Sequence, residues 1–152
     1  MPRFSDYLRR GFGRGADRRL LIWRKGSAAV SNEGPRVEVS GRFNLLGGLR
    51  VNHVNVSVAN SPYTAQGRDY LISVDSSKGP VDVQLPLASV AGSGSLLVIK
   101  DVAGFAGVNS ITIRPVVGES IEGASALVIT YAYAGNQLYS DGLSWYIFGA
   151  AQ

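Results

Sequence analysis

The sequence predicts an all-β protein, in which a small antiparallel sandwich or jelly-roll-like body follows an extended basic N-terminal arm. One observation is the uneven charge: residues 1–50 hold eleven Lys or Arg against four Asp or Glu, whereas residues 51–152 hold four against seven. Another is the number of glycines, 19, together with many Val, Ile and Ser, which suits short strands and tight turns. The third is apolar alternation with the period of a strand, and no helical period, after residue 68.

The first region is a basic arm with its linker, residues 1–35. A chain of 152 residues fits one domain or a small domain with an arm, and the charge asymmetry favours the arm. Ser5 is suited to cap a short helix that ends at Gly11, and the apolar piece at residues 20–23 is equally short. Neither piece is long enough to be stable alone in water. The candidate anchoring residues are Arg3, Arg9, Arg10, Arg14, Arg18, Arg19, Trp23, Arg24 and Lys25.

Residues 36–67 are expected to form a short β-region that connects the arm to the body. Residues 36–40 alternate as a half-buried strand should. The apolar phase then changes by one residue between His53 and Val54, and such a slip sends side chains to the opposite face of a strand. We therefore expect a bulge or bend at this point.

The expected body, residues 68–152, begins with three strands. Residues 70–75 and 81–86 alternate on either side of a turn that contains Gly79, which predicts a hairpin. Residues 96–99 form an unbroken apolar run. Such a run is typical of a strand that is covered on both faces.

The C-terminal part of the body is expected to contain further strands. Residues 111–114 and 127–133 have strand composition, and Ile121 is expected to supply a further short strand. Residues 137–139 and 145–148 flank a turn with Asp-Gly at its centre. Because Asp-Gly accommodates the positive φ that tight turns require, this segment predicts a closing hairpin.

An ordered series of short motifs runs through the body. In chain order the motifs are Tyr70-x-Ile72-x-Val74-Asp75, Gly79-Pro80-Val81-x-Val83-x-Leu85-Pro86, Val98-Ile99-Lys100-Asp101, Asn109-x-Ile111-Thr112-Ile113-x-Pro115, Gly118-x-x-Ile121-x-Gly123 and Leu138-x-Ser140-Asp141-Gly142-x-x-Trp145. Over residues 68–149 the series resembles the small β-modules of tailed-bacteriophage head fibres, capsid decoration proteins and tail fibres. The resemblance implies a trimeric module on the virion surface with a structural or adhesive role. It does not extend to residues 1–67.

The acidic residues of the body could in principle supply the carboxylate pair of a glycoside hydrolase. However, Asp75, Asp101 and Asp141 fall at expected strand ends or turns, where Asp bonds to nearby backbone. We therefore expect structural roles for the acidic residues, with no catalytic residue and no cofactor. The carboxylates considered are Asp75, Asp82, Asp101, Glu119, Glu122 and Asp141.

Metal, nucleotide and membrane sites are not expected either. The chain has no cysteine, and His53, its single histidine, has no neighbouring acid in the sequence, so we expect a packed or surface imidazole. The pattern of Gly11, Gly13 and Gly15 lacks the preceding strand and the following Lys-Ser/Thr of a phosphate loop. No stretch reaches the ~18 apolar residues of a membrane span, and the start lacks the apolar segment of a secretion signal.

The basic arm is compatible with three surroundings. Arginines with interleaved Phe4, Tyr7, Phe12 and Trp23 would suit nucleic acid, because phosphates bind Arg and bases stack on aromatic rings. The same residues suit an acidic protein surface, where Arg pairs with carboxylates and the aromatic rings act as anchors. A solvated tail is the third alternative. Because of the resemblance of the body, we favour docking on a protein, the major capsid protein, over nucleic acid.

Aromatic residues are concentrated near the C-terminus, where they could form a sugar-binding surface. In a small β-module such residues are more often core or subunit contacts. A body of about 85 residues has a marginal core of its own, so burial between subunits favours a homotrimer. The candidates for a subunit contact or ligand surface are Tyr131, Tyr133, Tyr139, Trp145 and Tyr146, with Phe148 in the same segment.

The sequence thus predicts a structural protein of the virion, located at the capsid surface. It would be a homotrimeric cement or decoration protein, similar to a head fibre, whose arms dock on the major capsid protein. Three arms on one trimer would strengthen individually weak docking through multivalency. The alternative is a tail-fibre or receptor-binding tip that recognises a host-surface glycan. A further alternative is a protein that binds nucleic acid through the basic arm.

Overall fold

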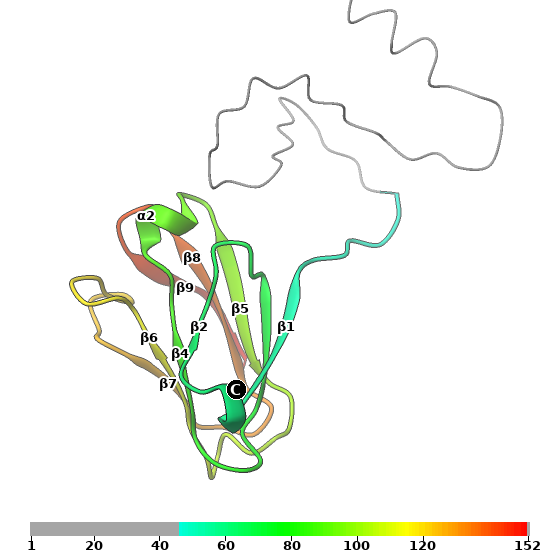
Figure 1. Cartoon of the computed structure of the whole chain (residues 1–152). Helices are drawn as coiled ribbons and strands as arrows, with labels where there is room; N and C mark the ends of the chain where they lie inside the picture. Colours follow the sequence, from blue (N-terminus) through cyan, green and yellow to red (C-terminus); the bar gives the residue numbers. More distant parts are fainter. Residues whose placement is uncertain (1–45, 152) are drawn as a thin grey trace, which may run out of the picture. The chain divides into compact units, whose positions relative to one another are not determined.

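The computed structural model describes residues 46–151, which consist almost entirely of strands and turns (Figure 1). These residues belong to the compact unit Leu45–Gln152. The candidate anchoring residues of the basic arm and the expected strand at residues 36–40 lie outside the described residues. Within residues 46–151, no helix has the length and apolar character needed to cross a membrane.

Two mixed β-sheets make up the described part of the chain. The five-stranded sheet, which we call sheet A, has the order β1-β3-β5-β8-β9, and the four-stranded sheet B has the order β2-β4-β6-β7. The strands of sheet A are β1 (His53–Ser57), β3 (Leu71–Asp75), β5 (Leu96–Asp101), β8 (Gly135–Ser140) and β9 (Trp145–Ala151). Those of sheet B are β2 (Tyr63–Thr64), β4 (Val81–Gln84), β6 (Ile111–Arg114) and β7 (Leu127–Ile129). A 3₁₀ turn, η1 (Val58–Asn60), follows β1, and a one-turn helix, α2 (Ala88–Ala91), follows β4.

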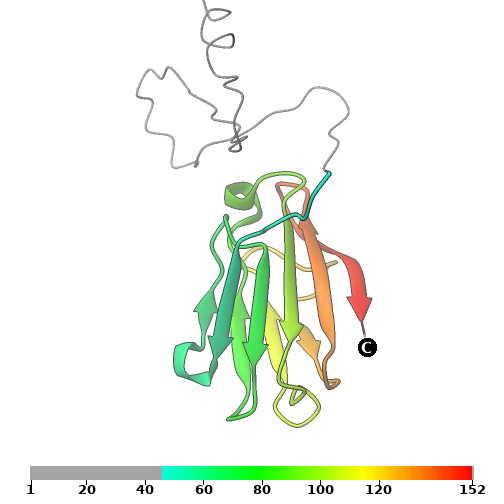
Figure 2. The same cartoon turned by 90° about the vertical axis from the view of Figure 1, so that its right-hand side faces the viewer.

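The chain crosses from one sheet to the other after every strand from β1 to β5 (Figure 2). As a result, β1, β3 and β5 lie parallel in sheet A, and β2, β4 and β6 lie parallel in sheet B. Antiparallel pairing begins with β7 on β6 and continues with β8 and β9. The expected antiparallel fold is therefore wrong for the first six strands. The physical reason is that two successive strands of one sheet are separated by a strand of the other sheet. The chain reverses direction twice between them, so they run parallel.

The expected hairpin of residues 70–86 is wrong for the same reason. The turn that contains Gly79 connects β3 of sheet A to β4 of sheet B, so these strands are not neighbours. The closing hairpin is confirmed, because β8 and β9 pair in antiparallel fashion with Ser140 opposite Trp145. Alternation in the sequence indicates which face of a strand is buried but not which strand lies beside it.

The strands of the expected connector are part of the same two sheets. β1 and β2 lie within residues 36–67, yet β1 pairs with β3 and β2 with β4. The expected bulge at His53 and Val54 is wrong, because β1 begins at His53 and keeps a continuous register with β3. The change of apolar phase marks the start of the strand. A register shift is found instead between β8 and β9, at Gln137 and Leu138.

One hydrophobic core is formed by inward-facing side chains of both sheets. Sheet A contributes residues such as Ile72 and Ile99, and sheet B contributes residues such as Val83 and Ile111; all four are fully buried. Burial of an aliphatic side chain of this size contributes roughly 1.5–3 kcal/mol to the free energy of unfolding. The core therefore fixes which faces of the two sheets point outward.

Candidate binding surfaces

The outer face of sheet A carries a patch of aromatic and aliphatic side chains. Tyr139 of β8 lies between Leu96 of β5 and Tyr146 of β9 in the strand register. The rings of Tyr139 and Tyr146 stack, with 5.2 Å between their centroids and an interplanar angle of 22°. The rings of Phe148 and Tyr139 form a T-shaped pair, with 6.4 Å between centroids and an interplanar angle of 83°. We call the set Leu96, Val98, Tyr139, Tyr146 and Phe148 the aromatic face.

β5 contributes aliphatic side chains to both of its faces. Leu97 and Ile99 lie in the core, whereas Leu96 and Val98 point outward and are only half buried by the described residues. The strand has the unbroken apolar run of one that is covered on both faces, but the described residues cover one face alone. The expected double coverage is therefore not met within residues 46–151.

Lys100 is the cation at the end of this face where β5 terminates. Its ammonium donates to the backbone carbonyl oxygens of Asp101, at 2.9 Å, and of Tyr133. The ammonium also lies 5.8 Å from the centroid of the Tyr133 ring. Its side chain crosses Gly135 so closely that a Cβ at that position would lie 2.9 Å from it. Lys100 is thus held at the rim of sheet A rather than projecting from the centre of the face.

Asp141 is the anion at the opposite end of the face, in the turn between β8 and β9. Its Oδ1 accepts hydrogen bonds from the backbone N–H of Leu143 at 2.8 Å and of Ser144 at 2.7 Å. These bonds, chiefly the one from Ser144, lower the pKa of Asp141. The charge on Asp141 in turn raises the pKa of Tyr146 above the usual tyrosine value of about 10. The phenol of Tyr146 is therefore neutral at physiological pH.

The structure places the predicted aromatic residues in three separate locations. Tyr139 and Tyr146 belong to the aromatic face. Tyr131 and Tyr133, which are 59% and 63% exposed, lie in the turn before β8, because the strand expected at residues 127–133 ends at Ile129. Trp145 lies in the core with 1% of its surface exposed, and its Nε1–H donates to the carbonyl oxygen of Pro86 at 3.1 Å. Trp145 is therefore a core residue and does not belong to a binding surface.

Sequence reasoning did not assign Leu96 and Val98 to a surface. The signal that could have identified them is the unbroken apolar pattern of β5, which is repeated in Trp145, Tyr146 and Ile147 of β9. When a strand alternates between core and solvent, such runs do not occur. Runs of this kind on two strands of one sheet indicate that these strands carry apolar side chains on both faces.

Two hollows open at the surface of the described residues. One, of about 230 Å³, lies between the edge strands β7 and β9 and is lined mainly by apolar side chains, among them Leu127, Ile129, Tyr131 and Ile147. The other, of about 330 Å³, lies on β1 and β3 and is lined by Asn55, Val56, Ser57, Ser73, Asp75 and Val102. Both hollows are small for a ligand site: ligand pockets typically measure ~300–1,000 Å³, so the first lies below this range and the second at its lower end.

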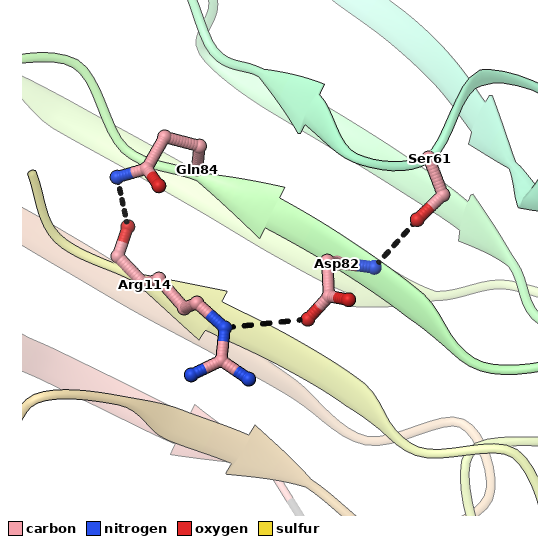
Figure 3. Close-up of polar contacts among 4 residues, drawn as sticks. All are labelled: Ser61, Asp82, Gln84 and Arg114. Carbon is pink, nitrogen blue, oxygen red and sulfur yellow. Dashed lines mark hydrogen bonds and ion pairs between the residues drawn. The ribbon is translucent and has the colours of Figure 1, made fainter.

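The outer face of sheet B is polar (Figure 3). Arg114 of β6 lies beside Asp82 of β4, with 3.5 Å between Nε and Oδ1, and both side chains are about half exposed. Gln84 donates from Nε2 to the carbonyl oxygen of Arg114 at 3.0 Å. The hydroxyl oxygen of Ser61 accepts a hydrogen bond from the backbone N–H of Asp82 at 2.9 Å. These groups tie neighbouring strands together and leave polar atoms facing solvent.

Asp101 is a buried carboxylate at the end of β5. Its oxygens accept hydrogen bonds from the backbone N–H groups of Ala103, Gly104, Ala106 and Tyr133, at distances of 3.0–3.1 Å. Burial alone would raise the pKa of Asp101, but the four backbone donors outweigh it and hold the pKa below its ordinary value. Asp101 therefore joins the loop after β5 to the turn before β8.

All seven acidic residues between 51 and 152 have a bonding partner among the described residues. In three of them the partners are nearby backbone N–H groups, which confirms the expectation for Asp75, Asp101 and Asp141. The other contacts are Glu119 with the backbone N–H of Ala88, Glu122 with that of Ile147, Asp82 with Arg114, and Asp69 with Asn52, Tyr63 and Gln66. Every carboxylate of the body is thus engaged in holding turns or strands.

His53 and Tyr63 take part in similar local contacts. The Nε2 of His53 lies 2.8 Å from the hydroxyl oxygen of Ser73, and its side chain is on the surface. Burial and then the hydrogen bond to Asp69 raise the pKa of Tyr63 to about 12. Within residues 46–151, no group of three or more His, Asp or Glu side chains is arranged to hold a metal ion.

Comparison with known proteins leaves the chain without an assigned relative. No protein-family model matches the sequence, and no curated protein matches it. The surfaces described above and the sequence motifs are therefore the basis for proposing a function.

Proposed function

We propose that this protein is a structural component of a virion, a cement or decoration protein similar to a head fibre. In this proposal, the basic arm docks on the major capsid protein, and the β-rich body projects from the capsid surface as a homotrimer with a sandwich-like arrangement of its two sheets. The motif series that resembles bacteriophage head-fibre, decoration and tail-fibre modules supports it, since these motifs run from β3 to β9.

The observation that carries the proposal is the engagement of the body's carboxylates in structural contacts. A carboxylate that acts in general acid–base catalysis must hold an oxygen within hydrogen-bond reach of a substrate proton. Here the seven acidic residues hold backbone donors, an amide, a hydroxyl or a guanidinium group. Such an arrangement favours binding without chemistry, which is what a cement protein requires.

The aromatic face supports the trimeric part of the proposal. It presents three aromatic rings and two aliphatic side chains on one side of a small body. Apolar surface of this kind is favoured at contacts between subunits, where it is removed from water.

The direct test uses a purified variant that lacks residues 1–25. We expect the truncated chain to remain folded and trimeric by circular dichroism and light scattering, and to lose binding to capsids assembled from the major capsid protein. Normal occupancy of capsids by the truncated protein would contradict the role of the arm.

A substitution series separates the arm's charge from the charge of the whole protein. Replacing Arg18, Arg19, Arg24 and Lys25 by Ser is expected to weaken capsid binding, with a further loss at higher salt. The matched control replaces four exposed cations of the described residues, Arg50, Arg68, Lys78 and Arg114, by Ser. Equal losses in the two variants would mean that only net charge matters. Tight DNA binding at physiological salt without capsid binding would favour the nucleic-acid alternative.

The second candidate function is a receptor-binding tip that recognises a host-surface glycan. The observation in its favour is the polar outer face of sheet B, where a carboxylate, a guanidinium group and an amide lie side by side (Figure 3). Planar groups of these types can form paired hydrogen bonds with sugar hydroxyls. If Gln84→Ala abolished binding to host cells while capsid binding was unchanged, the receptor-binding role would be favoured.

A further inference from the structure

The aromatic face of sheet A, which residues 46–151 leave uncovered, is the strongest feature that the proposed function leaves unexplained. Sheet B alternates between core and solvent, as in Val81, Asp82, Val83 and Gln84 of β4. Sheet A instead carries apolar side chains on both sides of β5 and β9, and the described residues cover one side alone. Phe148, at the edge of the patch, is 64% exposed. A sheet with two apolar faces is stable in water when something covers both of them.

We propose that the aromatic face is the surface through which copies of this chain associate, with the aromatic face of one copy packed on a second copy. This inference rests on the proposed function, because it assigns the contact that holds the proposed trimer together. It differs from the contact expected from the sequence in three respects. Tyr131 and Tyr133 lie in the turn before β8 and are not part of the aromatic face. Trp145 stays inside its own chain, and the aliphatic side chains of β5 contribute beside the tyrosines.

The charges around the face fit a second copy of the same chain. In a homo-oligomer, copies of one patch come together around a symmetry axis, so a charge near the centre of the patch would meet its own copy. Leu96, Val98, Tyr139, Tyr146 and Phe148 are all uncharged. Lys100 and Asp141 lie at opposite ends of the patch and are held by backbone groups of their own chain. Identical patches can therefore meet without bringing like charges together.

The arrangement of the rings favours a protein partner over a sugar. A sugar ring packs on the open face of an aromatic side chain. Tyr139 and Tyr146 stack on one another, so one face of each ring is already used, and the rings of Tyr139 and Phe148 form a T-shaped pair. The rings thus form a ridge beside the aliphatic side chains of β5. Ridges of this kind pack against the side chains of another protein surface.

The test measures the mass of the full-length protein by sedimentation equilibrium over a range of concentrations. We expect the wild type to form an assembly of 16.1 kDa chains. Phe148→Asp should raise the concentration needed for half-assembly at least tenfold, about 1.4 kcal/mol of association free energy. Val128→Asp is the matched control, because it places the same charge on an exposed valine of the outer face of sheet B. It should leave the assembly unchanged.

A second variant keeps the test independent of folding defects. Gln137→Glu adds a charge opposite Val98 without removing an apolar side chain, and it should weaken assembly in the same direction. Near-ultraviolet circular dichroism of each variant checks that the monomer is folded. A monomeric wild type, or unchanged assembly in both face variants, would overturn the inference. If the wild type is monomeric and Phe148→Asp abolishes capsid binding, the face docks on the capsid instead, which overturns self-association but leaves the virion role standing.

Discussion

The outer faces of the two sheets differ in a way that their inner faces do not. Both inner faces are built from Val, Ile and Leu and contribute to one core. The outer face of sheet B presents Asp82, Gln84 and Arg114 to solvent, whereas the outer face of sheet A presents a ridge of stacked rings. Because the inner faces are equivalent, the requirements of folding alone do not explain the contrast.

The contrast indicates which face of the protein is expected to bind other molecules. A sheet with one apolar face and one polar face is complete as a monomer in water. Sheet B satisfies this condition, whereas among residues 46–151 the part of sheet A formed by β5, β8 and β9 does not. The free energy that sheet A would gain from a partner is therefore available for association, while sheet B can remain solvated. The experiments below test this difference, from the largest expected effect to the smallest.

The inner and outer sides of β9 can be compared with two substitutions on one strand. Trp145→Ala removes a ring that is buried in the core and should lower the free energy of unfolding by about 3–5 kcal/mol. Phe148→Ala, on the outer face, should cost the isolated monomer much less. Urea unfolding at a concentration where the protein is monomeric measures both. Equal losses in the two variants would show that the two sides of β9 are not distinct.

Asp101→Asn tests the buried carboxylate that joins sheet A to the turn before β8. The amide retains one acceptor oxygen but turns an NH₂ group toward backbone donors, so we expect a loss of roughly 2 kcal/mol in the free energy of unfolding. Thermal unfolding of the two proteins at neutral pH measures it. Asp75→Asn is the control, because Asp75 lies on the surface and bonds to Ser77 alone among backbone donors. A smaller loss for Asp101→Asn than for this control would contradict the structural role.

The stability difference between wild type and Asp101→Asn should depend on pH. The folded protein lowers the pKa of Asp101, so the folded state favours the charged carboxylate. Its contribution is complete above the unfolded-state pKa of about 3.9 and is lost as the pH falls through the folded pKa. We therefore expect the difference to be constant near neutral pH and to shrink on acidification below about pH 4. A difference that grows on acidification would mean that folding raises the pKa of Asp101 instead of lowering it.

Much of the strand pattern could be predicted from the sequence, but the pairing of the strands could not. The closing hairpin was identifiable because Asp141 and Gly142 form a turn between adjacent strands of one sheet. The turn at Gly79 carries a similar signal, yet it leads to the other sheet. Short turn motifs report a change of direction, whereas pairing depends on which strands share the core. Alternation is identical for parallel and antiparallel neighbours.

The candidate surface was predictable in part for a related reason. Tyr139 and Tyr146 were identified by residue type, and the strand register brings them together. Residue type alone also selected Trp145, whose ring points to the core because it lies one position before Tyr146. The outward direction of Leu96 depends on the register of β5 with β8, which composition does not reveal.

A titration of Tyr146 tests whether the charge of Asp141 lies close to the aromatic face. The negative charge of Asp141 raises the pKa of Tyr146, so Asp141→Asn should lower that pKa toward its ordinary value. The asparagine oxygen can still accept from Leu143 and Ser144, so the turn should persist. Difference absorbance of tyrosinate between pH 8 and pH 12, with Tyr146→Phe to identify the signal, provides the measurement. An unchanged pKa would place Asp141 away from the face.

The smallest effect is expected on the polar side. Arg114 and Asp82 form an ion pair whose side chains are half exposed, and such pairs contribute about 0–1 kcal/mol. Arg114→Gln should therefore change the free energy of unfolding by no more than this, and added salt should have little further effect in the variant. Chemical denaturation at low and high salt checks both points. A loss comparable to that of Trp145→Ala would show that sheet B is not simply a solvated face.

The alternation of the chain between the two sheets also has a consequence for how fast the protein folds. A hairpin closes between residues that are near one another in the sequence, but β1 pairs with β3 across an intervening strand, β2, that lies in the other sheet. The same holds for β2 with β4 and for β3 with β5. Proteins dominated by such distant pairings fold on the order of milliseconds to seconds, because the cost of closing long loops comes before the stabilising contacts form. A newly made chain is therefore expected to expose its apolar strands for longer than a hairpin-built protein of equal size.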